Sequence, residues 1–296
     1  MSPLDFLIDL FNPDLAFLPK ALAIAVMSSL VCGVVGSYVV LRGMAFIGDA
    51  VAHAVFPGVA IGFVLNINLS LSGAVAGVAT ALAIVLISQT RRLKEDTVIG
   101  IFWAAAFGLG IVVVSTQQSY TGDLASFLFG QILALGDEDV VLVGTAGAVL
   151  VLATFLLRRQ LIAVSLDRET ARASGLPVLA LDMALYVMVT VAIVIALQAV
   201  GNILVLALLV TPAAAARLVT DRLGPMVLVG CAVAAFGAVA GLYLSFYYNL
   251  AAGGLIVLVI TGVFLLAWLF APRHGIIARW TGRRAAAFAN AASAGR

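Results

Sequence analysis

Nine segments of about 20 predominantly apolar residues follow one another along this chain, a series that is typical of membrane proteins. Of the 296 residues, 64% are hydrophobic and 10% are charged. A soluble domain carries roughly 25% charged residues. The sequence therefore predicts an all-α, polytopic membrane protein with about nine transmembrane helices, near residues 21–41, 49–66, 70–89, 97–116, 139–157, 179–198, 201–219, 225–247 and 253–270.

The basic residues predict how these helices are oriented. With nine spans, 15 of the 16 Lys and Arg residues fall on one side of the membrane, and only Lys20 falls on the other. Cytoplasmic loops are enriched in Lys and Arg, so the basic side is predicted to be cytoplasmic. The N-terminus is then outside and the C-terminus inside. We expect residues 1–270 to form one transmembrane domain, followed by a basic cytoplasmic tail over residues 271–296.

Two segments between the spans carry further information. Residues 117–138 are predicted to lie outside and are partly apolar, so a short helix at or in the membrane would satisfy their backbone groups. On the cytoplasmic side, LDRETARASGLP (166–177) contains Asp167, which can cap a helix start, and Gly175, which can end a helix. This segment predicts a cytoplasmic helix of about two turns between the fifth and sixth spans.

A carboxylate and an imidazole stand one helical turn apart in FIGDAVAHAVFPGVAIGF (46–63). Asp49 and His53 share a helix face, with Cβ atoms about 6 Å apart, and could bind one divalent cation. A charged residue within a span costs about 3 kcal/mol on insertion scales, which calls for a reason. A structural explanation is also open, in which the pair ties helices together or Asp49 caps the span. The span boundaries place Asp49 near the cytoplasmic start of its helix.

Two prolines interrupt the hydrogen bonding of their spans. Pro57 has no N–H, so the carbonyl of His53 loses its helical partner and becomes a third candidate ligand. Pro212 does the same to the carbonyl of Leu208, and broken helices in both halves of a membrane protein often mark a transport site. In each case a plain kinked helix is the alternative.

Other charged residues near the span ends have structural interpretations. Asp96, in LKEDTVIG (93–100), is predicted to cap the fourth span. Arg42 is predicted to be a positive-inside anchor, with a polar link to Asp49 as the alternative. The chain contains no G-x-x-x-x-G-K-[ST], H-E-x-x-H or C-x-x-C motif. The sequence therefore predicts no ATPase site and no enzyme activity of its own.

Five stretches occur in a fixed order and cover most of the chain: GSYVVLRGMAFIGDAVAHAVFPGVAIGF (36–63), LKEDTVIGI (93–101), DLASFLFGQIL (123–133), SLDRETARASGLP (165–177) and VGNILVLALLVTPAAAARL (200–218). Together they resemble the membrane permeases of bacterial ABC importers for zinc, manganese and iron(II). The resemblance implies the type II ABC importer permease fold. It also implies that Asp49 and His53, in the G-D-A-x-x-H motif, contact the transported metal.

The resemblance further implies several partners. A second permease copy would complete the pathway, two copies of a separate ATP-binding subunit would dock on the cytoplasmic side, and an extracytoplasmic metal-binding protein would deliver the ion. Residues 165–177 resemble the coupling helix that contacts the ATP-binding subunit, and the residues expected to act there are Asp167, Arg168, Glu169, Ala171 and Gly175. Neither nucleic acid nor a permanently bound cofactor is expected.

The leading hypothesis is a permease subunit in the bacterial cytoplasmic membrane that imports Mn²⁺, Zn²⁺ or Fe²⁺ at the expense of ATP. Nitrogen and oxygen ligands without thiolate suit all three ions and do not select among them. One alternative is a proton-coupled secondary metal transporter with Asp49 and His53 as a proton relay. Another is a permease of the same fold for a metal chelate such as a siderophore.

Overall fold

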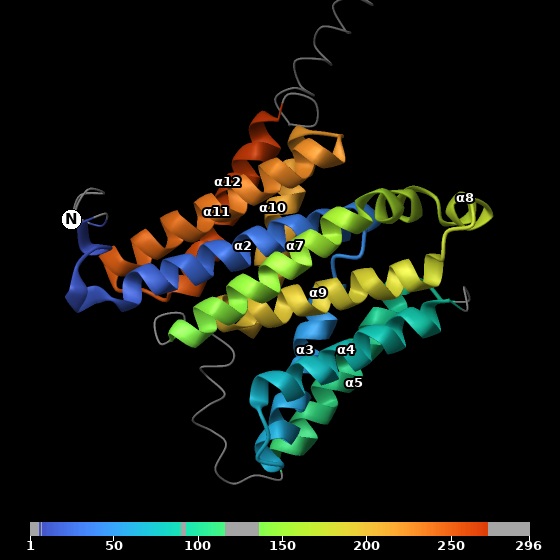
Figure 1. Cartoon of the computed structure of the whole chain (residues 1–296), viewed down its shortest axis with the longest axis horizontal. Coiled ribbons are helices and arrows are strands. Elements are labelled where there is room, and N and C mark those ends of the chain that lie inside the picture. Colours follow the sequence, from blue (N-terminus) through green and yellow to red (C-terminus); the bar gives the residue numbers. More distant parts are fainter. Residues whose placement is uncertain (1–5, 7, 90–92, 116–135, 272–296) are drawn as a thin grey trace, which may run out of the picture.

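The computed structural model describes residue 6 and residues 8–89, 93–115 and 136–271. Within these ranges the chain forms helices and no strands (Figure 1). The elements are η1 (Pro13–Leu15), α2 (Phe17–Arg42), α3 (Ile47–Val64), α4 (Leu69–Ser88), α5 (Glu95–Ser115), α7 (Asp137–Leu166), α8 (Arg168–Ala173), α9 (Val178–Val200), α10 (Asn202–Val219), α11 (Leu223–Tyr248) and α12 (Ala252–Phe270).

The predicted spans are confirmed as helices. Among the described residues, eight helices are long and apolar enough to cross a membrane, and α10 contributes a ninth, shorter apolar helix over Val205–Val219. The predicted helix between the fifth and sixth spans is α8. Residues 117–135 of the outer segment and residues 272–296 of the tail lie outside the described residues, so the predictions for them stay predictions.

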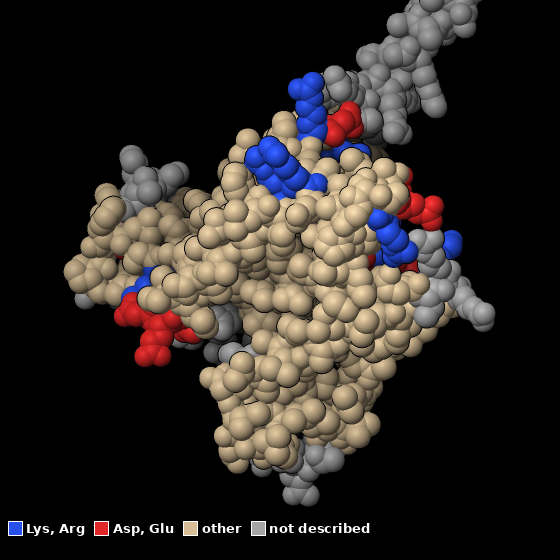
Figure 2. All heavy atoms as spheres, turned by 45° about the vertical axis from the view of Figure 1, so that its right-hand side comes forward, with Lys and Arg blue, Asp and Glu red and all other residues tan. Residues whose placement is uncertain are grey.

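The helices form two groups that meet at α9. In Figure 1, α3, α4 and α5 pack together below α9, while α2, α7 and α10–α12 pack above it. Helix α9 packs against α4 and α3 on one side and against α2, α7 and α10 on the other. On the face shown in Figure 2, charged side chains gather near the edges and leave a broad uncharged surface between them. That distribution suits a protein embedded in lipid.

Contacts between helix ends agree with the predicted arrangement of the first, fifth and sixth spans, α2, α7 and α9. At one end of the bundle, Arg42 at the end of α2 reaches Asp182 near the start of α9 and Ser165 near the end of α7. At the other end, Lys20 Nζ near the start of α2 lies 2.7 Å from Asp137 Oδ1 at the start of α7. Helix ends that were expected to share a membrane side therefore do so.

Close packing between helices depends on glycine at specific positions. A Cβ atom added to Gly36 in α2 would lie 1.9 Å from the carbonyl oxygen of Leu209 in α10. One added to Gly58 in α3 would lie 2.7 Å from the carbonyl oxygen of Ser72 in α4. Backbones approach this closely in membranes because small residues leave room for dispersion contacts between helices.

Candidate functional site

Asp49 and His53 face one another on α3. The Asp49 Oδ1 atom lies 3.5 Å from His53 Nε2, and the two side chains are 33% and 20% exposed. Two ligand atoms of one tetrahedral ion, each about 2.1 Å from it, are about 3.4 Å apart. The pair therefore has the spacing that one bound cation requires. The described residues contain no group of three or more His, Cys, Asp and Glu side chains that could hold a metal, so this part of the chain supplies two such ligands.

Two aromatic side chains of α5 flank the imidazole. The ring of His53 lies edge-on to Trp103 and Phe107, with centroid distances of 5.5 and 5.3 Å. Trp103 and Phe107 are themselves stacked, with 7° between their planes. We did not predict this aromatic pair from the sequence. Its signal is WAAAF (103–107), which places two aromatic rings one turn apart beside small residues.

Asp49 lies in the first turn of α3, as expected, but that turn lies inside the bundle and not at its end. With a rise of 1.5 Å per residue, Trp103 and Phe107 are about 12 and 18 Å along α5 from Glu95, near the middle of that helix. His53, between these rings, shares that level.

The chain reaches this depth because it turns back into the bundle after Arg42. Gly43 has a left-handed φ of 72° and ends α2, with its N–H directed at the carbonyls of Val39 and Val40. Met44 is buried in the connection that follows. Gly48 then packs against side chains of α10, because a Cβ there would lie 3.0 Å from a methyl carbon of Leu206. Helix α3 therefore starts inside the protein.

The two prolines do not break their helices. Pro57 lies within α3, which continues to Val64, and Pro212 lies within α10, which continues to Val219. Neighbouring helices at membrane depth allow a helix to pass through a proline without ending. Both spans are therefore continuous helices through their prolines. The carbonyl of His53 still lacks its usual helical hydrogen-bond donor, because Pro57 has no N–H to donate.

Helix α8 has the cap and the end that the sequence predicted. The Asp167 carboxylate accepts hydrogen bonds from the N–H of Glu169 at 2.9 Å and of Thr170 at 3.2 Å, and from the Thr170 hydroxyl. The Thr170 hydroxyl, followed by these N–H groups, holds the pKa of Asp167 below its ordinary value. Gly175, with φ of 80°, follows the end of the helix.

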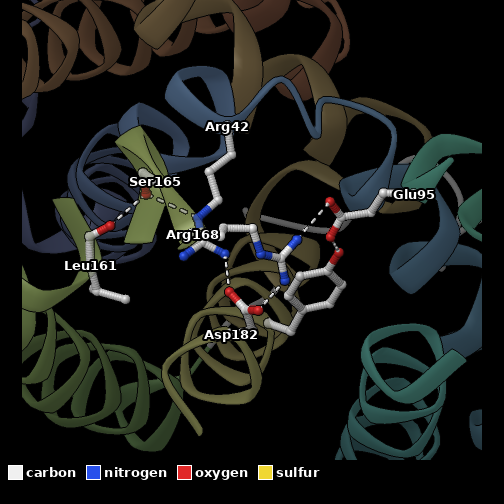
Figure 3. A network of polar contacts seen from close by, with 7 residues as sticks. Arg42, Glu95, Leu161, Ser165, Arg168 and Asp182 are labelled. Carbon is white, nitrogen blue, oxygen red and sulfur yellow. Dashed lines mark hydrogen bonds and ion pairs between the residues drawn. The ribbon is translucent and has the colours of Figure 1, made fainter. Parts of the chain in front are cut away.

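The five residues expected to contact an ATP-binding subunit do not share one surface. Asp167, Glu169 and Gly175 are exposed. Ala171 is buried against Val164 and its neighbours, and so anchors α8 to its own chain. Arg168 points into the protein, where its guanidinium meets a set of polar side chains (Figure 3).

Asp182 is the centre of that polar set. Its carboxylate accepts hydrogen bonds from Arg168 and from Arg42, the latter at 2.7 Å. The Asp182 and Arg42 side chains are 1% and 7% exposed, and Arg42 also donates to Ser165 at 2.9 Å. Removing one member of a buried ion pair leaves an uncompensated charge. The partner of Arg42 is therefore Asp182, and the proposed link to Asp49 was wrong.

Glu95 connects this set to α5. It accepts a hydrogen bond from the Tyr186 hydroxyl of α9, and its Oε2 atom lies 3.8 Å from Arg168 Nη1. Helix α5 begins at Glu95, and the carbonyl of Lys94 accepts from the N–H of Thr97 and of Val98. Asp96 therefore lies in the first turn of α5 and is not its cap, which corrects the sequence interpretation.

Sequence reasoning missed Asp182 and Tyr186. The signal for Asp182 was available, since it is the one charged residue in the predicted span over residues 179–198. The insertion cost that drew attention to Asp49 applies equally to Asp182. Tyr186 follows it by one helical turn, which places both side chains on one face of α9.

Comparisons with known proteins find relatives over nearly the whole chain. Residues 14–271 match the model of the ABC 3 transport family. The chain is 40% identical over 286 residues to the manganese transport system membrane protein MntC of Halalkalibacterium halodurans, covering 96% of this chain and 98% of that protein. It is 37% identical over 275 residues to the chelated iron transport system membrane protein YfeC of Yersinia pestis, covering 93% and 92%. A solved structure of PsaBC from Streptococcus pneumoniae in complex with Fab superposes with a TM-score of 0.82 at 37% identity, covering 92% of this chain and 98% of that chain.

Proposed function

The chain belongs to the ABC 3 transport family, and from that membership we propose that it is the membrane permease subunit of an ATP-driven importer for a divalent transition-metal ion. The observation that carries the proposal is the Asp49–His53 pair, whose facing atoms are 3.5 Å apart beside the middle of α5. An ionisable pair at that depth is a functional site by default. The relatives are named for manganese and iron transport, and carboxylate and imidazole ligands suit Mn²⁺, Fe²⁺ and Zn²⁺.

The ligand set suggests that two permease copies complete the site. The described part of one chain supplies one carboxylate and one imidazole, and the carbonyl of His53 adds an oxygen. A second copy placed around a two-fold axis would bring the same groups from the opposite side. Two pairs would then surround the ion with four nitrogen and oxygen ligands, which is enough to replace much of its hydration shell during passage. The absence of thiolate from this ligand set suits passage better than tight storage.

The energy for transport would come from a separate subunit. The sequence contains no phosphate-binding G-x-x-x-x-G-K-[ST] motif. Helix α8 carries the exposed carboxylates Asp167 and Glu169 at the end of the bundle where 15 of the 16 basic residues are predicted to gather. We propose that the α8 helix of each permease copy docks on one of two copies of an ATP-binding subunit. An extracytoplasmic metal-binding protein would supply the ion on the opposite side.

Uptake of radioactive manganese, iron(II) and zinc by proteoliposomes tests this function. The vesicles would hold the permease with its ATP-binding subunit, and the metal-loaded binding protein would be supplied outside. Asp49→Asn and His53→Gln keep the side-chain size and remove a charge or a ligand nitrogen. Each is expected to lower ATP-dependent uptake by about tenfold or more, because a lost metal ligand or its orienting partner typically costs 10–100-fold. Asp96→Asn, the same change at an exposed position of α5, serves as the control.

The other outcomes separate the alternatives. Uptake that is independent of ATP and is driven by a pH gradient would show a proton-coupled transporter. Uptake of a siderophore-bound metal that survives both substitutions would show a chelate permease, and the relative from Yersinia pestis is named for chelated iron transport. Uptake of the free ion that survives both substitutions would make the pair a structural tie.

A further inference from the structure

We propose that Glu95, Asp182 and Tyr186 link helix α8 to the aromatic pair beside His53, so that movement of α8 repositions Trp103 and Phe107 at the metal site. This inference rests on the proposed transport function and deepens it. The set of Arg168, Asp182, Tyr186 and Glu95 is called the α8–α5 link below. It joins three helices, α8, α9 and α5, at one end of the bundle (Figure 3).

The first step is that α8 is tied to the interior by Arg168. Its guanidinium is bonded to the buried carboxylate of Asp182, which Arg42 holds from the other side. Two guanidinium groups around one carboxylate compensate its burial, and separation of either would leave a charge poorly paired in an apolar setting. Movement of α8 is therefore passed to α9 through the Arg168–Asp182 bond.

The second step is that α5 is attached to this anchor through Glu95. Helix α5 packs mainly against α3 and α4, within the lower group of Figure 1. Glu95 at its first position accepts a hydrogen bond from Tyr186 and lies 3.8 Å from Arg168. The Arg168–Glu95 separation is near the outer limit of an ion pair, whereas the Arg168–Asp182 contact is a direct hydrogen bond. The hydrogen bond between Tyr186 and Glu95 is therefore the contact that passes movement of α9 to α5.

The third step is that α5 carries a displacement of Glu95 to the metal site. A helix keeps its rise of 1.5 Å per residue because its backbone hydrogen bonds are all internal, so a shift of its first turn moves the whole helix. Trp103 lies about 12 Å from Glu95 along that helix, and its ring touches the imidazole of His53 edge-on. The link thus runs from α8 through Asp182 and Tyr186 of α9 to Glu95 at the start of α5.

The test compares the number of ATP molecules hydrolysed per metal ion imported by the reconstituted transporter. Glu95→Met and Tyr186→Phe each remove the hydrogen bond that attaches α5 to α9 and change the side-chain volume little. Asp96→Met removes a neighbouring, exposed carboxylate from the same helical turn and is the matched control. We expect ATP hydrolysis to persist in both variants while uptake falls. The number of ATP molecules hydrolysed per imported ion should then rise about fivefold or more, which corresponds to a coupling free energy of ordinary size.

A double variant separates coupling from damage to the fold. If Glu95 and Tyr186 act as one contact, Glu95→Met combined with Tyr186→Phe should give the same ratio as either change alone. Hydrolysis and uptake that fall together, leaving the ratio at its wild-type value, would overturn the proposal, as would effects of the two changes that multiply. Wild-type transporter that imports no metal would overturn the proposed function and this inference with it. Wild-type uptake with unchanged ratios in the variants would overturn this inference alone.

Discussion

Gly36 has no side chain at the point where α2 crosses the backbone of α10. A Cβ there would lie 1.9 Å from the Leu209 carbonyl oxygen, and backbone atoms cannot rotate away as a flexible side chain can. We expect Gly36→Ala to separate the two helices and to destabilise the purified permease by about 1–3 kcal/mol or more, the usual cost of overpacking a tight contact. Thermal unfolding of the detergent-solubilised protein measures this.

Gly100→Ala is the control for that prediction. It makes the same substitution in helix α5, where an added Cβ would meet no atom within 4 Å. Replacing a helical glycine by alanine at an open position favours the helix. The unfolding temperature of Gly100→Ala should therefore equal or exceed that of the wild type, and an equal loss in both variants would refute the packing argument.

Single residues were predictable from the sequence where a charge stands in an apolar span, but their partners were not. Asp49 and His53 were identified because their spacing defines a shared helix face. Arg42 was assigned to the membrane boundary, and its bond to Asp182 joins positions 140 residues apart. Spacing along a helix carries no information about which helix lies opposite. The same limit hid Trp103 and Phe107 as neighbours of His53.

At the scale of the element, helix α8 depends on its N-cap because it has only six residues. Asp167→Ala removes the acceptor for the N–H groups of Glu169 and Thr170 and for the Thr170 hydroxyl. We expect amide hydrogen exchange in α8 to speed up several-fold, whereas Asp167→Asn should retain most of the protection because its amide oxygen can still accept. Unchanged exchange in Asp167→Ala would show that the packing of Ala171 alone holds the helix.

The same cap predicts a pH dependence. The pKa of Asp167 is lowered in the folded protein, first by the Thr170 hydroxyl and then by the two N–H groups. A carboxyl group with a lowered pKa stabilises the fold above its ordinary pKa, and that contribution is lost as pH falls through the folded value. Protection of α8, corrected for the intrinsic exchange rate, should therefore be constant near neutral pH and decline only below about pH 4. Asp167→Asn should show no such decline.

Whole elements were more predictable than their boundaries. Hydropathy over about 20 residues identified each span, because crossing lipid demands that length of apolar helix. It did not predict that α7 continues to Leu166, since a helix can extend into water once the span has formed. It also placed the start of α3 at the membrane surface, whereas the buried connection through Met44 starts that helix inside the protein. Packing against α10 determines where α3 starts, and no local sequence pattern predicts that packing.

At the scale of the whole molecule, the two ends of the bundle carry different polar contacts. One end holds the α8–α5 link and Arg42, and the other holds the ion pair of half-buried Lys20 with exposed Asp137. The structure fixes which helix ends lie together, and the asymmetry of basic residues predicts which end faces the cytoplasm. The proposed docking of α8 on an ATP-binding subunit requires that this end face the cytoplasm.

Labelling of single cysteines at opposite ends of the bundle tests the orientation of the chain in the membrane. In a background in which Cys32 and Cys231 are replaced, Asp137→Cys provides a thiol at a position whose native side chain is 82% exposed, and Ser174→Cys provides one at the exposed end of α8. A membrane-impermeant maleimide should label Asp137→Cys in right-side-out vesicles and Ser174→Cys in inverted vesicles freed of the ATP-binding subunit. The reverse pattern would place α8 outside and exclude its proposed docking on a cytoplasmic ATPase. Asp137 begins α7, and α8 follows the end of α7. Labelling of both positions from one side would therefore contradict the prediction that α7 crosses the membrane.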